Sequence, residues 1–275
     1  MNQQKFLIDE GLSAFYRNDY HVAIVALTEA RLHAPNNPDV LHGLSAALYG
    51  AGDYQEALNV YKDFIKRFPG NFTAHEGAGL AYNRLGDKKS ALREFRTLVN
   101  LAPDNPISFT LLSAFYRKSK QFEAAHKELQ AAQNVAPEHL NVYLEQGALA
   151  EAEQKLGDAF NYYEAALDLD PESHHATMRL GYCYLEAKQY QDARLFFDRA
   201  LELRSNSPDA LYGLALAEIA LQHWQEGMRV LRSLIVIRPR SEQAYVALLR
   251  TQIRLLQFRG AWKTLSEWVS YLANH

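Results

Sequence analysis

Proline recurs in this sequence at a fixed interval, and this feature constrains the fold more than any other. Every gap in the series equals one constant interval or twice that interval. The series consists of Pro35, Pro69, Pro103, Pro137, Pro171 and Pro239, and Ser205 occupies the one skipped position. Proline lacks a backbone N–H and clashes with the preceding helical turn, so it ends helices. A helix end that recurs after the same number of residues predicts a tandem array of units of equal length.

A second break falls midway between the prolines. Short polar stretches stand there: GDY at 52–54, GDK at 86–88, KQF at 120–122 and KQY at 188–190. Each unit is therefore predicted to be a helix, a tight turn, a second helix and a short loop that carries the proline.

The helices themselves repeat by position. Small residues recur at Gly11, Ser45, Gly79, Ser113, Gly147, Gly181 and Ala215, and again at Ala23, Ala57, Ala91, Ala125, Ala159, Ala193, Gly227 and Ala261. Four residues after the second series stand Leu27, Tyr61, Phe95, Leu129, Tyr163, Phe197, Leu231 and Leu265. Residues four apart share a helix face, so each helix is predicted to cross its neighbour closely beside a large side chain. Each helix pair then leaves an apolar face that the next pair covers, which is the arrangement of a solenoid.

These residues resemble the tetratricopeptide repeat, whose 34-residue unit has the pattern W-x2-L-G-x2-Y, A-x3-F, A and P. The segment from His175 to Tyr184, followed by Ala193, Phe197 and Ala200, matches this pattern. The resemblance covers nearly the whole chain, with units starting at about 4, 38, 72, 106, 140, 174, 208 and 242. The last two units depart from it: Glu218 and Gln252 replace the aromatic residue, Leu249 the small residue and Ala273 the proline.

The resemblance implies an all-α fold, a right-handed superhelical solenoid of helix-turn-helix repeats. We expect residues 1–275 to form a single repeat array.

Composition excludes several classes of protein. Hydrophobic residues make up 48% of the 275 residues and charged residues 22%, which is typical of a globular chain. The formal charge of −3 does not suggest a nucleic-acid partner, and one cysteine excludes an internal disulfide framework. The start MNQQKFLIDEG has no apolar signal region, and no run is long enough for a membrane span. We expect a cytoplasmic protein; the alternative is a periplasmic protein from which a signal peptide has been removed.

No catalytic constellation is recognisable in the sequence. His174 and His175 lie near Glu172 at a loop-to-helix junction, but no second ligand motif favours a metal site over a solvated helix start. Cys183 falls on a core-facing position and is expected to be a buried, unreactive thiol. We therefore expect a protein that is not an enzyme and needs no cofactor or metal.

The resemblance also implies that the first helix of each unit lines a concave groove that holds a peptide or a partner chain. The positions predicted to bind a partner are His42, Tyr49, Glu76, Asn83, Arg84, Arg117, Lys118, Glu151, Met178, Arg179, Tyr182, Tyr212, Arg250 and Arg254. Apolar neighbours in the last two units include Leu216, Ile219 and Val246, although such residues at helical spacing are often core.

Glycine recurs at another first-helix position, in Gly43, Gly77 and Gly213. We expect these glycines to leave room for a bulky side chain or helix of a partner. Some members of the family grip the C-terminal carboxylate of heat-shock chaperones through a basic and asparagine set. The matching positions here carry Ile8, Leu12, Gly43, Thr73 and Gly77, so that clamp is absent.

The C-terminal segment, AWKTLSEWVSYLANH, is predicted to leave an apolar face uncovered. Leu265 and part of Trp268 should pack on the first helix of the same unit, while Trp262, Val269 and Leu272 face outward. A patch with two large aromatic residues is rarely left bare in a soluble monomer. We expect these four residues, Trp262, Trp268, Val269 and Leu272, to be covered end-on, by a second copy in a homodimer, by a partner or by further sequence.

The sequence thus predicts a non-catalytic interaction scaffold or adaptor that binds a protein or peptide partner in its groove. Two alternatives stay open: an assembly factor of the bacterial cell envelope or secretion machinery, and the targeting module of a larger enzyme.

Overall fold

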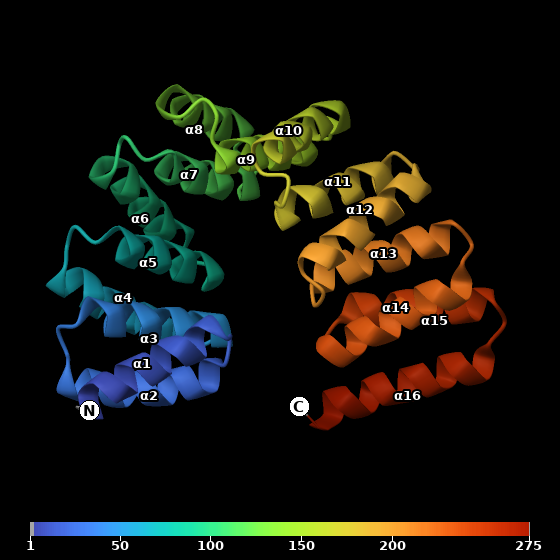
Figure 1. Ribbon diagram of the computed structural model, residues 1–275, viewed down its shortest axis with the longest axis horizontal. Helices are drawn as coiled ribbons and strands as arrows, with labels where there is room; N and C mark the ends of the chain where they lie inside the picture. The colour runs from blue at the N-terminus through green and yellow to red at the C-terminus, as the bar shows by residue number, and fades with distance from the viewer. Residues whose placement is uncertain (1–2, 275) are drawn as a thin grey trace. The chain divides into compact units, whose positions relative to one another are not determined.

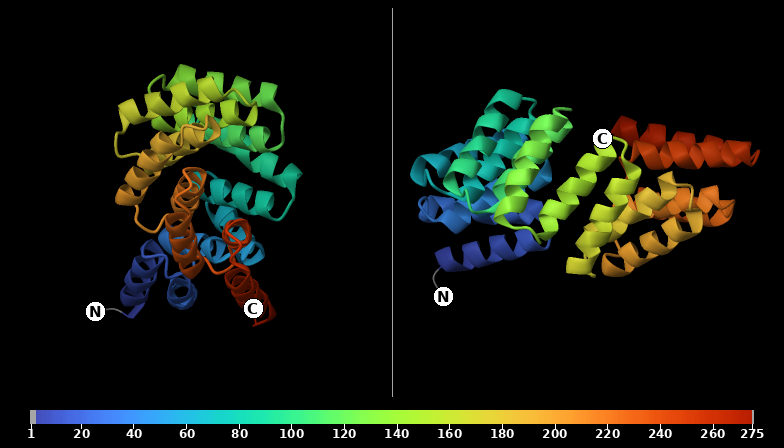
Figure 2. Two further views of the ribbon diagram at one scale, coloured as in Figure 1. Left: turned by 90° about the vertical axis from the view of Figure 1, so that its right-hand side faces the viewer. Right: turned by 90° about the horizontal axis from the view of Figure 1, so that it is seen from above.

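The computed structural model describes residues 3–274, and all regular secondary structure within this range is helical (Figure 1). The helices form two compact units, one up to Pro137 and one from Glu138 onward. Within each unit, successive helices pack against one another in chain order (Figure 2).

The first unit contains four helix pairs. Their helices are α1 (Gln3–Tyr16), α2 (Tyr20–His33), α3 (Pro38–Ala51), α4 (Tyr54–Arg67), α5 (Phe72–Arg84), α6 (Lys88–Leu101), α7 (Pro106–Lys118) and α8 (Phe122–Val135).

The second unit also contains four pairs. Its helices are α9 (Leu140–Ala152), α10 (Leu156–Leu169), α11 (His174–Glu186), α12 (Tyr190–Leu203), α13 (Pro208–Ala220), α14 (Trp224–Ile237), α15 (Glu242–Arg254) and α16 (Phe258–Asn274). From Pro38 to Glu242, the first helices of successive pairs begin at the same constant interval as the prolines.

The loop between pairs both ends one helix and starts the next. Two residues after each proline position stands a residue whose side chain accepts a hydrogen bond from the backbone of the following first helix. These N-cap residues are Asn37, Asn71, Asn105, His139, Ser173, Ser207 and Ser241. Asparagine and serine are strong N-caps, and each contributes about 1 kcal/mol to helix stability. The period of the repeat is therefore set locally, because the proline that ends one helix and the N-cap residue that begins the next lie in the same loop.

The turn inside each pair is equally regular. One residue in each turn has a positive φ: Asn18, Gly52, Gly86, Lys120, Gln154, Lys188, Gln222 and Leu256. The next residue donates its backbone N–H to a carbonyl five positions earlier, as from Gln189 to Tyr184 at 2.9 Å. This left-handed ending of a helix closes the turn in the same way in every pair.

Close crossing of the helices depends on glycine. A Cβ built on Gly181 would lie 2.9 Å from the Phe197 ring, and one on Gly213 would meet the same ring. Phe197, on the second helix of one pair, thus packs between the first helix of its own pair and that of the next pair. Leu27 lies in the same way between Gly11 and Gly43 in the first unit. Successive pairs pack tightly because one large side chain occupies the space beside two glycines, one in each pair.

The predicted all-α fold of helix-turn-helix repeats is confirmed. Among residues 3–274, no helix is both long enough and apolar enough to cross a lipid bilayer.

Candidate interaction groove

An open groove lies between α13 and α15 in the second unit. Its volume is about 410 Å³, within the range of ligand-binding clefts. Its lining residues come only from these two first helices: Tyr212, Leu216 and Ile219 from α13, and Glu242, Gln243, Val246, Ala247, Arg250 and Thr251 from α15.

The helical period places these side chains on one face of each helix. Tyr212, Leu216 and Ile219 follow one another at helical spacing, as do Val246 and Arg250. Ser207 caps α13 through the Ala210 N–H and Ser241 caps α15 through the Ala244 N–H, which fixes where both helices start. The groove therefore has an apolar floor on two helices whose ends are defined.

The rim of the groove is polar. Glu242 and Gln243 are exposed in the first turn of α15, and Arg250 is exposed two turns further along the helix. A segment bound along α15 would meet a carboxylate near one end and a guanidinium near the other. Apolar side chains would be favoured in the middle, and acidic groups near Arg250.

Of the positions predicted to bind a partner, the groove brings together Tyr212 and Arg250. The predicted apolar neighbours Leu216, Ile219 and Val246 also line it. Arg254 lies apart, with its guanidinium 4.8 Å from the Trp224 ring centroid. Sequence reasoning missed Glu242, Gln243, Ala247 and Thr251. Ala247 could have been found, because it stands exactly one repeat after Gly213 on the same face.

Three other predicted residues of the second unit contact one another. The Arg179 guanidinium forms an ion pair with Glu151 and lies 5.8 Å from the Tyr182 ring centroid. The Tyr182 hydroxyl donates a hydrogen bond to the Asp209 carbonyl at 2.7 Å, and burial raises its pKa. These groups are engaged within the chain, so they are less available to a partner than the groove between α13 and α15. Met178 is partly buried and packs against the core of the second unit.

Predicted residues of the first unit are also tied to neighbours. The Arg84 Nε donates to the Tyr49 hydroxyl at 3.2 Å, and its guanidinium lies 5.8 Å from the Tyr54 ring. His42 packs edge-on to Phe15 and is partly buried, which lowers the pKa of its imidazole.

The remaining predicted residues of the first unit differ in burial. Burial raises the pKa of the partly buried Glu76 carboxyl. Asn83 and Arg117 are partly buried, and Lys118 is exposed.

The expectation for Gly43, Gly77 and Gly213 is wrong. All three are buried, and the chain's own side chains fill the space beside them. A Cβ on Gly43 would lie 2.7 Å from Leu12, one on Gly77 would meet the Tyr61 ring, and one on Gly213 the Phe197 ring. These glycines serve the packing of successive repeats and leave no room for a partner.

Cys183 is buried, with 1% of its surface exposed. Burial raises the pKa of its thiol from 9.0 to about 11, because the effect of desolvation outweighs that of the nearby Arg179 charge. Its Sγ lies 3.9 Å from a Glu151 carboxylate oxygen. The thiol is therefore neutral and shielded at physiological pH. Within residues 3–274, no group of three or more His, Cys, Asp and Glu side chains is arranged to hold a metal ion.

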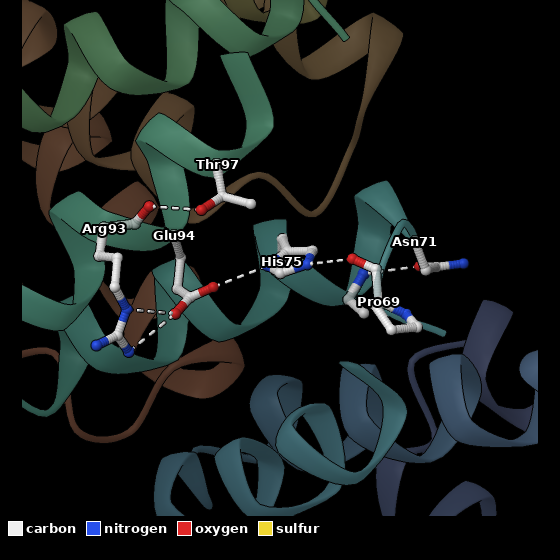
Figure 3. Close-up of polar contacts among 7 residues, drawn as sticks. Pro69, Asn71, His75, Arg93, Glu94 and Thr97 are labelled. Atoms are coloured by element: carbon white, nitrogen blue, oxygen red, sulfur yellow. Dashed lines mark hydrogen bonds and ion pairs between the residues drawn. The ribbon is translucent and has the colours of Figure 1, made fainter. Parts of the chain in front are cut away.

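A buried polar pair in the first unit was not predicted (Figure 3). The His75 Nδ1 lies 2.8 Å from a Glu94 carboxylate oxygen, and its Nε2 donates to the Pro69 carbonyl at 2.8 Å. Arg93 donates to the other Glu94 oxygen at 3.1 Å. Because every polar atom of this pair has a partner and little of it reaches solvent, it links α5 to α6 rather than forming a binding site.

The residues predicted for end-on association lie on α16. Trp262, Val269 and Leu272 are 73%, 57% and 59% exposed. Trp268 is partly buried and stacks on Tyr245 of α15 at a centroid distance of 5.4 Å. Leu265 is 38% exposed, so it packs on α15 less completely than the sequence suggested. The equivalent residue of α14, Leu231, is buried by the repeat that follows it. No such repeat follows α16 in the described residues.

Comparison with known proteins agrees with this repeat architecture. A family model described as tetratricopeptide repeat matches residues 42–106, and one described as anaphase-promoting complex, cyclosome, subunit 3 matches residues 152–234. No curated protein matches the chain in sequence. The helix pairs and these matches together show tandem repeats of the tetratricopeptide type, although each model matches less than half of the chain. Repeats of this kind generally form non-catalytic scaffolds for protein interactions.

Solved structures share the fold at low sequence identity. Yeast Tom70 superposes with a TM-score of 0.72 at 18% identity, over 96% of this chain and 60% of its own. A tetratricopeptide repeat protein from Parabacteroides merdae gives 0.69 at 15%, over 92% of this chain and 100% of its own. The APC/C hetero-tetramer Cut9–Hcn1 gives 0.68 at 16%, over 87% of this chain, which spans 47% of the matched chain. Because 433 chains match in structure, the fold does not specify one function.

Proposed function

We propose that this protein is a non-catalytic scaffold that binds a peptide or helical segment of a partner protein in the groove between α13 and α15. The observation that carries the proposal is the groove itself, with an apolar floor of Leu216, Ile219, Val246 and Ala247 open to solvent at one side. An extended or helical segment could bury apolar anchors there. The APC/C structure, in which Cut9 is assembled with Hcn1, shows that a protein of similar fold joins a hetero-oligomer.

The rim defines the chemistry of the segment. Arg250 is exposed beside the apolar floor, and no ion-pair partner for it is found among residues 3–274. An acidic residue next to the apolar anchors would therefore be favoured, through a charge-assisted hydrogen bond to the guanidinium. Lysine or arginine at that place would be repelled.

A peptide-display selection on the intact chain tests the proposal. Selected peptides should share apolar anchors with a neighbouring acidic residue, and bind at about micromolar strength. Val246→Glu puts a charge on the apolar floor and should weaken binding at least tenfold by calorimetry. Arg250→Glu should weaken acidic peptides more than neutral ones, since it reverses the charge at the rim.

Val236→Glu provides the matched control. Val236 lies on α14, outside the groove, and is 80% exposed. The same substitution there should leave peptide affinity and helicity unchanged. Peptides that bind the wild type and the Val246→Glu protein equally would contradict the assignment of the groove.

A further inference from the structure

The outer face of α16 carries an apolar seam. Five exposed residues follow the a and d positions of two heptads: Phe258, Trp262, Leu265, Val269 and Leu272. Such a seam, with apolar residues spaced alternately by four and three, is typical of helices that pair with another helix. The helix lies at the edge of its unit in Figures 1 and 2, and among residues 138–274 no further helix lies beyond it.

The equivalents of the three central seam residues are covered in α14. Trp262, Leu265 and Val269 stand one repeat after Met228, Leu231 and Ile235 of α14. Met228 and Leu231 are 1% and 0% exposed, and Ile235 packs against the same core. The seam of α16 thus has the same character as a surface that is buried between repeats.

The N-terminal end of another copy does not fit this seam. The first helix of each pair packs against the preceding pair. In α3, Gly43 and Ala47 lie on that face and are buried. Their equivalents in α1 are Asp9 and Ser13, both exposed. Head-to-tail stacking would bury the Asp9 carboxylate against Leu265, which is unfavourable without a paired charge.

The seam does fit itself. Counted from Leu265, the seam residues lie at positions −7, −3, 0, +4 and +7. This spacing is nearly the same when it is read in either direction along the helix. An antiparallel two-fold pairing with Leu265 at the axis brings Phe258 opposite Leu272 and Trp262 beside Val269 of the other copy. No charged residue lies in the seam, so like charges are not forced together.

We propose that two copies of this chain associate through an antiparallel, two-fold pairing of their α16 helices along this seam. The proposal is independent of the groove between α13 and α15. Burial of the five side chains on both copies removes on the order of 1,000 Å² from water, the lower limit for a specific interface. The dimer is therefore weak and depends on concentration.

Sedimentation equilibrium of the intact chain tests the proposal. The weight-average mass should rise from that of a monomer toward that of a dimer between about 1 and 500 μM. Trp262→Ser combined with Val269→Ser should weaken the dimer at least tenfold, because both seam residues lose their apolar contact. Since both sites are exposed, the melting curve should stay close to that of the wild type. Val236→Ser, at a valine of α14 that is 80% exposed, should leave association unchanged.

A cysteine variant identifies the contacting helix. Ser266 lies next to the proposed axis, so Ser266→Cys should form a disulfide-linked dimer under mild oxidation. Ser233→Cys, at an exposed serine of α14, should cross-link much more slowly. A strictly monomeric wild type, a dimer that the double serine variant leaves intact, or equal cross-linking of the two cysteine variants would each overturn the proposal. A monomer would assign the seam to a different occupant, either a partner protein or a following segment of chain.

Discussion

At the scale of single residues, His75 and Glu94 occupy places that apolar residues hold in other repeats. The equivalent positions carry Leu41 with Val60, and Leu211 with Val230, all buried. Between α5 and α6, the hydrogen-bonded pair of His75 and Glu94 replaces this apolar contact. A buried polar pair contributes little net stability but is costly to break, because the surviving partner is left without a hydrogen bond.

A double-mutant cycle on this pair should give strongly non-additive free energies of unfolding. Glu94→Val alone leaves the His75 Nδ1 buried without its carboxylate and should destabilise the protein by about 3 kcal/mol. His75→Leu together with Glu94→Val recreates the Leu211–Val230 contact and should return to within about 1 kcal/mol of the wild type. Urea denaturation followed by circular dichroism measures both. A double variant no more stable than the Glu94→Val protein would show that the apolar pair of another repeat cannot substitute here.

At the scale of secondary-structure elements, the turn inside each repeat places a left-handed residue at a fixed position. Glycine occupies it at Gly52 and Gly86, but Lys188 and Leu256 adopt φ values of 60° and 56°. A residue with a Cβ in this conformation is strained by about 1–2 kcal/mol. Several repeats therefore tolerate a suboptimal turn, because the helices on both sides hold it in place.

Lys188→Gly should raise the free energy of unfolding by about 1 kcal/mol, since glycine adopts positive φ without steric strain. Ala187→Gly, one residue earlier at a φ of −70°, should instead lower it by about 0.5–1 kcal/mol. Thermal melting of the two variants beside the wild type checks the contrast. If both glycines act in the same direction, turn strain is not what limits stability at this site.

At the scale of the whole molecule, contacts in a repeat array join neighbouring pairs, so stability is local. Cys183 of α11 offers a probe of this locality. Its thiol pKa is raised by burial, so the folded state favours the neutral thiol. That contribution to stability is intact below the ordinary pKa of 9.0 and is lost as the pH rises through about 11.

Labelling of Cys183 by a thiol reagent at about pH 8 should require local opening of the second unit. Gly213→Ala forces a Cβ against Phe197 in the adjoining pair and should speed labelling roughly tenfold or more, as expected for an overpacked core. Gly157→Ala, where the added Cβ meets nothing within 4 Å, should not speed it. Glu94→Val, on α6, should also have a smaller effect than Gly213→Ala. Equal acceleration by the three variants would indicate a single cooperative transition.

The sequence by itself determined the repeat, its length and the ends of its helices. The prolines, the asparagine and serine caps and the midpoint turns act within a few residues of chain, so their effect can be read without tertiary structure. The buried position of Cys183 and the exposure of Trp262 also followed from helical spacing.

Only the tertiary structure decided which surface positions remain open. Arg179 pairs with Glu151 of the preceding repeat, and Tyr182 bonds to a carbonyl of the next repeat. Gly77 and Gly213 looked like space for a partner, but Tyr61 and Phe197 fill it. The spacing of the repeat places such side chains on the same face of the helices. Whether they contact each other or solvent depends on the rotamer of each side chain and on its nearest neighbours in the structure. The candidate groove between α13 and α15 is an example, because the small and apolar residues that line it leave an open space between the two helices.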